Sequence, residues 1–91
     1  MNYHDPEQAA AWLVEQGFVE QGALDSLRQA QTRRHLMELS LPVWDGIVAV
    51  MQRRRVRERV DFPGVQQRYA AYTDAIERDF PLEESKGPIV L

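Results

Sequence analysis

Four of the five prolines divide this chain into segments whose lengths suit helices. They stand at positions 6, 42, 63 and 81. Proline is tolerated in the first turn of a helix, but in the interior it removes a hydrogen bond and clashes with the preceding turn. The spacing therefore predicts an all-α fold, a small bundle of three to four helices, in a single domain over residues 1–81. An extended C-terminal tail is expected over residues 82–91.

The first and last segments have the clearest helix patterns. Asp5 before Pro6 is typical of a helix start and Gly17 of a helix end, so a helix is expected over residues 6–16. In the last segment, which Pro63 opens, apolar residues recur every three or four positions and cover an arc of about 80°. This apolar stripe consists of Val65, Tyr69, Tyr72, Ile76 and Phe80.

The stripe has two interpretations. We favour packing within one chain, on Trp12, Leu13, Trp44 and Ile47. However, its narrowness is closer to the seam of two paired helices than to the wider face of a core helix, and tyrosine suits interfaces. The candidate partner-binding residues on this helix are therefore Tyr69, Tyr72 and Ile76, and a homodimer is an alternative to a different partner.

The middle of the chain leaves two questions open. Apolar residues over 23–30 are followed by a polar stretch over 31–35, which fits either one bent helix or two short helices. Residues 43–51 place their apolar side chains on one helical face, and we favour a helix there. The alternative is an α+β fold, because Asp45-Gly46 is a preferred hairpin turn and residues 47–50 suit a strand.

Positive charge is concentrated in the stretch QRRRVRERV, residues 52–60. Residues 51–60 carry a net charge of +4, whereas residues 1–50 carry −4 and residues 61–91 carry −3. A buried helical face cannot continue straight past residue 55, so most of these guanidinium groups should be exposed. The candidate partner-binding arginines are Arg53, Arg54, Arg55, Arg57 and Arg59.

An exposed arginine cluster suits an acidic protein surface or the phosphates of nucleic acid. The chain has a net charge of −3 and a sequence pI of about 5.3, and no aromatic residue is interleaved for stacking on bases. We therefore expect an acidic protein partner, with nucleic acid as the alternative and a solvated, internally salt-bridged face as the third interpretation. Replacing Arg54 and Arg55 by Glu should abolish capture of that partner with little loss of folding.

Other classes of chemistry find little support in the residues. The chain has 91 residues and no cysteine, which leaves no disulfide or Cys-containing zinc site and little room for a deep pocket. His4 and His35 lie far apart, without a second ligand at metal-binding spacing. We expect no enzymatic activity and no cofactor. The start lacks a signal-peptide pattern and no apolar run reaches membrane length, so a cytoplasmic protein without membrane contact is expected.

Two short stretches resemble known families. Leu24-Asp25-Ser26-Leu27 resembles the Asp-Ser-Leu site of acyl carrier proteins, which implies a phosphopantetheine arm on Ser26, at the start of a helix. Residues 13–18, followed by Leu24 and Leu27, look like small helix–turn–helix modules of bacterial assembly and adaptor proteins.

The sequence thus predicts a small protein-binding adaptor, accessory subunit or inhibitor. It would act through its arginine patch and its aromatic helix seam. The alternatives are a nucleic-acid-binding regulator that uses the arginine cluster and, third, a phosphopantetheine carrier.

Overall fold

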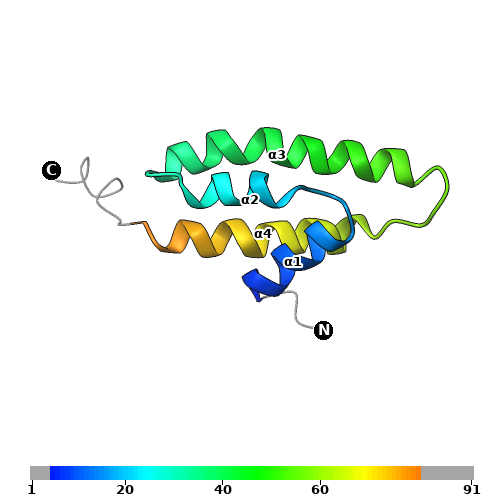
Figure 1. Ribbon diagram of the computed structural model, residues 1–91, viewed down its shortest axis with the longest axis horizontal. Coiled ribbons are helices and arrows are strands. Elements are labelled where there is room, and N and C mark those ends of the chain that lie inside the picture. Colours follow the sequence, from blue (N-terminus) through cyan, green and yellow to red (C-terminus); the bar gives the residue numbers. More distant parts are fainter. Residues whose placement is uncertain (1–4, 81–91) are drawn as a thin grey trace, which may run out of the picture.

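The computed structural model describes residues 5–80, which form four α-helices (Figure 1). They are α1 (Pro6–Glu15), α2 (Gln21–Arg28), α3 (Arg33–Arg54) and α4 (Phe62–Arg78). No strand occurs within residues 5–80, so the all-α prediction is confirmed and the hairpin around Asp45-Gly46 is wrong. The tail predicted over residues 82–91 lies outside the described residues.

Three of the helices begin with a side-chain N-cap. Asp5, Thr32 and Asp61 each accept a hydrogen bond from a backbone N–H in the first turn of α1, α3 and α4, at 3.0–3.2 Å. Each cap gives an acceptor to a backbone N–H that has no partner within the helix, and it stabilises the helix by about 1 kcal/mol. The starts predicted at Asp5-Pro6 and near Pro63 are therefore confirmed.

Helix α1 ends at Gly17, as its sequence predicts. The N–H groups of Gly17 and Phe18 donate to the carbonyls of Val14 and Leu13, both at 3.0 Å. This pairing is the Schellman motif, which requires a left-handed residue after the helix, and Gly17 has a φ of +79°. The Phe18 ring then stacks on Trp12 with 5.6 Å between centroids. The turn therefore fixes where the chain leaves α1.

The polar stretch over residues 31–35 separates two helices. Helix α2 ends at Arg28, and α3 begins at Arg33 after the Thr32 cap. Between them, the buried Ala30 anchors the connection in the core. Of the two arrangements that the sequence left open, the structure therefore has two separate helices rather than one bent helix.

Helix α3 continues through Pro42, which corrects the prediction that this proline separates two segments. Pro42 has no N–H, so the carbonyl of Glu38 has no donor one turn later. The Pro42 residue itself is exposed. Leu36 on one side of it and Ile47 and Met51 on the other are buried in the same core. Packing on both sides therefore offsets the cost of an interior proline, about 3 kcal/mol.

Helix α4 supplies the centre of the core. It contacts each of the other three helices, and Figure 1 shows α2 and α3 on one side of it and α1 against it. Its buried side chains meet apolar residues from every other helix. The main members are Leu13 of α1, Leu24 and Leu27 of α2, Ile47 and Met51 of α3, and Val65, Tyr69, Tyr72 and Ile76 of α4. This confirms packing of the stripe within one chain.

Among the helices formed by residues 5–80, none combines the length and the apolar character that crossing a bilayer requires.

Gly17→Ala should destabilise the protein by about 1–2 kcal/mol, because an L-residue is strained at this positive φ. The added methyl would also lie 2.7 Å from a guanidinium nitrogen of Arg54. The matched control is Gly46→Ala, inside α3, where a Cβ meets no atom within 4 Å. That change should stabilise by about 0.5–1 kcal/mol. Urea unfolding followed by circular dichroism measures both, and equal stability of the two variants would contradict the role of Gly17.

Candidate partner-binding site

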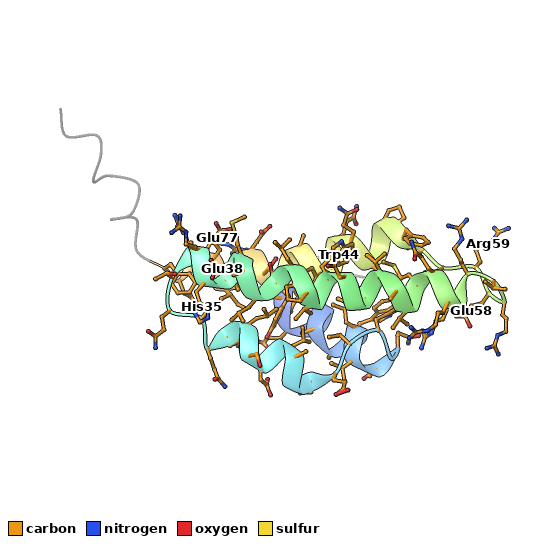
Figure 2. The ribbon with its side chains drawn as sticks, turned by 90° about the horizontal axis from the view of Figure 1, so that it is seen from above. His35, Glu38, Trp44, Glu58, Arg59 and Glu77 are labelled. Carbon is orange, nitrogen blue, oxygen red and sulfur yellow. The ribbon has the colours of Figure 1, made fainter. Side chains whose placement is uncertain are left out.

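The clustered arginines lie at one end of the bundle, where the chain turns from α3 back to α4. We call residues 53–59 the arginine loop; its first two residues complete α3 and the rest form the connection. Figure 2 shows Glu58 and Arg59 at this end, whereas His35 and Glu77 lie at the opposite end. The arginine loop carries five arginines and one glutamate, a net charge of +4. The other described residues carry five arginines and eleven acidic residues, a net charge of −6.

Two of these arginines pack on aromatic rings. The guanidinium carbon of Arg54 lies 4.7 Å from the centroid of Phe18, and that of Arg55 lies 5.8 Å from the centroid of Phe62. Arg54 is half-buried because it continues the face of α3 that buries Ile47. Such cation–π contacts contribute roughly 0.5–1 kcal/mol each. We therefore revise the prediction that Arg54 and Arg55 can be replaced with little loss of folding.

These ring contacts continue from the arginine loop into the bundle. Arg54 covers Phe18, Phe18 stacks on Trp12, and the guanidinium carbon of Arg68 lies 3.8 Å from the Trp12 centroid. Arg68 is only 5 % exposed, although it is charged. Its stem and guanidinium therefore form part of the interior between α1 and α4.

The other three arginines of the loop face solvent. Arg53, Arg57 and Arg59 are exposed, and their side chains make no ion pair or hydrogen bond within residues 5–80. Ion pairs occur elsewhere in that part of the chain, for example between Arg28 and Glu7 and between Arg33 and Glu77. Within residues 5–80, these three arginines therefore do not form the salt-bridged face that the sequence left open as a third interpretation.

Two open hollows border the arginine loop. The larger has a volume of about 540 Å³ and combines arginines with apolar side chains. The smaller, of about 400 Å³, lies beside the turn that ends α1. The larger is lined by Arg55, Val56, Arg57, Glu58, Arg59, Val60 and Phe62, and the smaller by Gly17, Val50, Arg53, Arg54, Arg57 and Glu58. Both hollows present guanidinium groups to anything that docks on this end.

The other predicted partner-binding residues, Tyr69, Tyr72 and Ile76, lie in the interior. The Tyr69 hydroxyl donates to the carbonyl of Ser40 at 2.8 Å, and its ring stacks on Trp44 with 5.3 Å between centroids. The structure does not bring these three residues and the arginines onto one surface. In this structure, the bundle's own helices α1, α2 and α3 cover the stripe.

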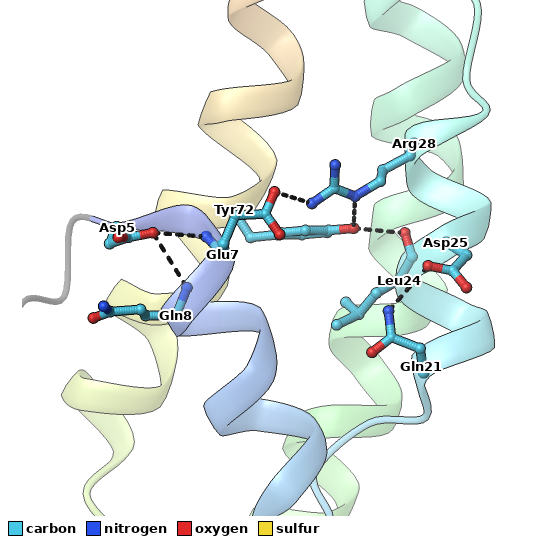
Figure 3. A network of polar contacts seen from close by, with 8 residues as sticks. All are labelled: Asp5, Glu7, Gln8, Gln21, Leu24, Asp25, Arg28 and Tyr72. Atoms are coloured by element: carbon cyan, nitrogen blue, oxygen red, sulfur yellow. Dashed lines mark hydrogen bonds and ion pairs between the residues drawn. The ribbon is translucent and has the colours of Figure 1, made fainter.

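Tyr72 is the centre of a polar network that joins three helices (Figure 3). Its hydroxyl donates to the carbonyl of Leu24 and accepts from Nε of Arg28, both at 2.9 Å. Nη2 of Arg28 also pairs with Oε2 of Glu7 at 2.6 Å. Burial raises the pKa of Tyr72, and the hydrogen bond to Glu7 raises the pKa of Arg28. The network therefore links α1, α2 and α4 at a 1 % exposed side chain.

The remaining candidates stand apart from both sets. Ser26 lies within α2 rather than at its start, where the carrier-protein resemblance would place it, and its hydroxyl donates to the carbonyl of Gly22 at 3.1 Å. His35 is exposed in the first turn of α3, and His4 lies outside the described residues. No group of three or more histidine, cysteine or acidic side chains within residues 5–80 is arranged to hold a metal ion.

Comparison of the chain with protein-family models, with curated proteins and with solved structures finds no match.

Sequence reasoning missed the apolar part of the arginine loop. Val56 is 82 % exposed and shares the larger hollow with Val60 and Phe62. The pattern that could have revealed it is a single valine inside a run of charged residues.

Tyr72→Phe should lower the free energy of unfolding by about 1–3 kcal/mol. The change keeps the ring but leaves the carbonyl of Leu24 and Nε of Arg28 without this partner. The matched control is Thr73→Val on the same helix, whose hydroxyl only bonds back to the carbonyls of α4. Urea unfolding compares the two, and a Tyr72→Phe protein as stable as wild type would show that the network contributes no net stability.

Stability should fall in alkaline solution because burial raises the pKa of Tyr69 from about 10 to about 12. A raised folded-state pKa means that this contribution is complete below pH 10 and is lost as the pH rises towards 12. Two pKa units correspond to roughly 2–3 kcal/mol. Urea unfolding at pH 8 to 11.5 should show a shallower decline for Tyr69→Phe. Identical slopes for the variant and the wild type would contradict this assignment.

Proposed function

We propose that this chain is a small protein-binding adaptor, accessory subunit or inhibitor, without catalysis of its own. Its arginine loop docks on an acidic surface of another protein. The observation that supports this function best is the exposure of Arg53, Arg57 and Arg59, without ion-pair partners in residues 5–80, at the end of an otherwise acidic bundle. Guanidinium groups suit paired, planar contacts with carboxylates.

The distribution of charge favours a local acidic patch over a long polyanion. The arginine loop carries +4, but the rest of the described chain carries −6. A duplex that extends past the loop would meet this negative charge, whereas an acidic patch on a protein can contact the loop alone. Phe18 is buried and Phe62 is half-buried beneath Arg55, so neither offers a free ring to an unstacked base.

The double variant Arg57→Glu/Arg59→Glu should lose partner capture from the native host by at least tenfold and keep the melting temperature of the wild type. Neither side chain makes a contact in residues 5–80 that would hold the fold. Arg34→Glu/Arg78→Glu is the matched control, since it changes the net charge equally at exposed positions away from the loop. Quantitative mass spectrometry of cross-linked complexes measures capture.

Two outcomes would contradict this function. Equal loss of capture in both double variants would show that net charge, not the arginine loop, controls binding. Sub-micromolar binding of the wild type to random duplex DNA at physiological salt, with an affinity that falls steeply as salt is raised, would favour the nucleic-acid alternative, since phosphate contacts weaken in this way.

A further inference from the structure

The arginine loop carries an exposed apolar side chain as well as its charges. Three large apolar side chains among residues 5–80 are mostly exposed, and Val56 is the most exposed of them at 82 %, ahead of Met37 and Leu41. Val60 and Phe62, both half-buried, line the same hollow as Val56. A purely electrostatic surface would gain nothing from a valine in this place, because an exposed apolar side chain is unfavourable in water.

Arginines accompany these apolar side chains. Arg55, Arg57 and Arg59 line the same hollow, and Arg55 is held over the Phe62 ring. A ligand that fills the hollow therefore meets both apolar atoms and guanidinium groups. This combination matches a segment with an apolar side chain between carboxylates.

We propose that the arginine loop recognises an acidic protein segment through an apolar side chain that this segment inserts against Val56. The inference rests on the proposed function and names what distinguishes its partner from any other acidic surface. Exposed ion pairs contribute little and are screened by salt, so charge alone discriminates poorly among acidic surfaces. Burial of an apolar side chain adds a contribution that salt does not screen.

Glu58 has an opposing effect in the same hollow. It is exposed, lines both hollows, and makes no ion pair within residues 5–80. Its carboxylate repels those of an incoming acidic segment. Glu58→Gln should therefore strengthen the binding of every acidic ligand, whereas Val56→Ser should weaken only ligands that carry the apolar side chain.

Two synthetic peptides test the inference with the full chain. Each has two acidic residues on either side of a central position, which is phenylalanine in one and serine in the other. Isothermal titration calorimetry should give about tenfold tighter binding of the phenylalanine peptide, as expected for partial burial of one large side chain. That ratio should persist when the salt concentration is raised, although both affinities fall.

Substitutions test whether the arginine loop causes the difference in affinity between the two peptides. Val56→Ser should abolish the tenfold ratio, and Leu41→Ser, a control at an exposed apolar position of α3, should keep it. Glu58→Gln should tighten both peptides severalfold. Wild-type affinities that do not distinguish the peptides, or no binding of either, would overturn the inference, while loss of host-partner capture in Arg57→Glu/Arg59→Glu would still support the proposed function. Tighter binding of single-stranded oligothymidylate than of the phenylalanine peptide would overturn it in favour of nucleic acid.

Discussion

The burial of Tyr72 beneath α2 is the interaction on which the rest of the bundle depends. Helices α1 and α2 have ten and eight residues, fewer than the roughly 12–15 that an isolated helix needs in water. Helix α1 is held mainly by α4, and α2 is held by α3 and α4. The Tyr72 hydroxyl is satisfied as donor by Leu24 and as acceptor by Arg28, and Arg28 in turn holds Glu7 of α1. Tertiary contacts thus supply the stability that helices of this length lack in isolation.

The sequence predicts those parts of the fold that local chemistry decides. The N-cap at Asp5 and the turn at Gly17 act within a few residues, and both are where the sequence predicts them. Pro42 shows the limit of such rules, because apolar packing before and after it outweighs a local defect. The candidate site likewise has a part that the sequence predicts and a part that depends on the fold. The charge of the arginine loop is visible in the sequence, but the contact of Arg54 with Phe18 depends on where the α1–α2 connection lies in space.

Segregation of charge gives the molecule an electrostatic axis. Positive charge gathers at the end where α3 meets α4, and negative charge is spread over the remaining described residues. A partner with an acidic surface is therefore attracted to one end and repelled elsewhere, which orients the encounter before contact and raises the association rate at low salt. Arg54 and Arg55 contribute both to packing and to the positive potential at this end, since their guanidinium groups remain charged while they cover Phe18 and Phe62.

The ring contacts that begin at Arg54 also give the chain an optical property. Trp12 contacts both the Phe18 ring and the Arg68 guanidinium, and Phe18 in turn lies beneath Arg54. Indole emission and near-ultraviolet dichroism depend on the charges and rings around the chromophore. An event that displaces Arg54 changes the surroundings of Phe18 and, through it, those of Trp12. The fold therefore contains a native chromophore connected to Arg54, so displacement of that side chain can be followed by spectroscopy without an attached dye.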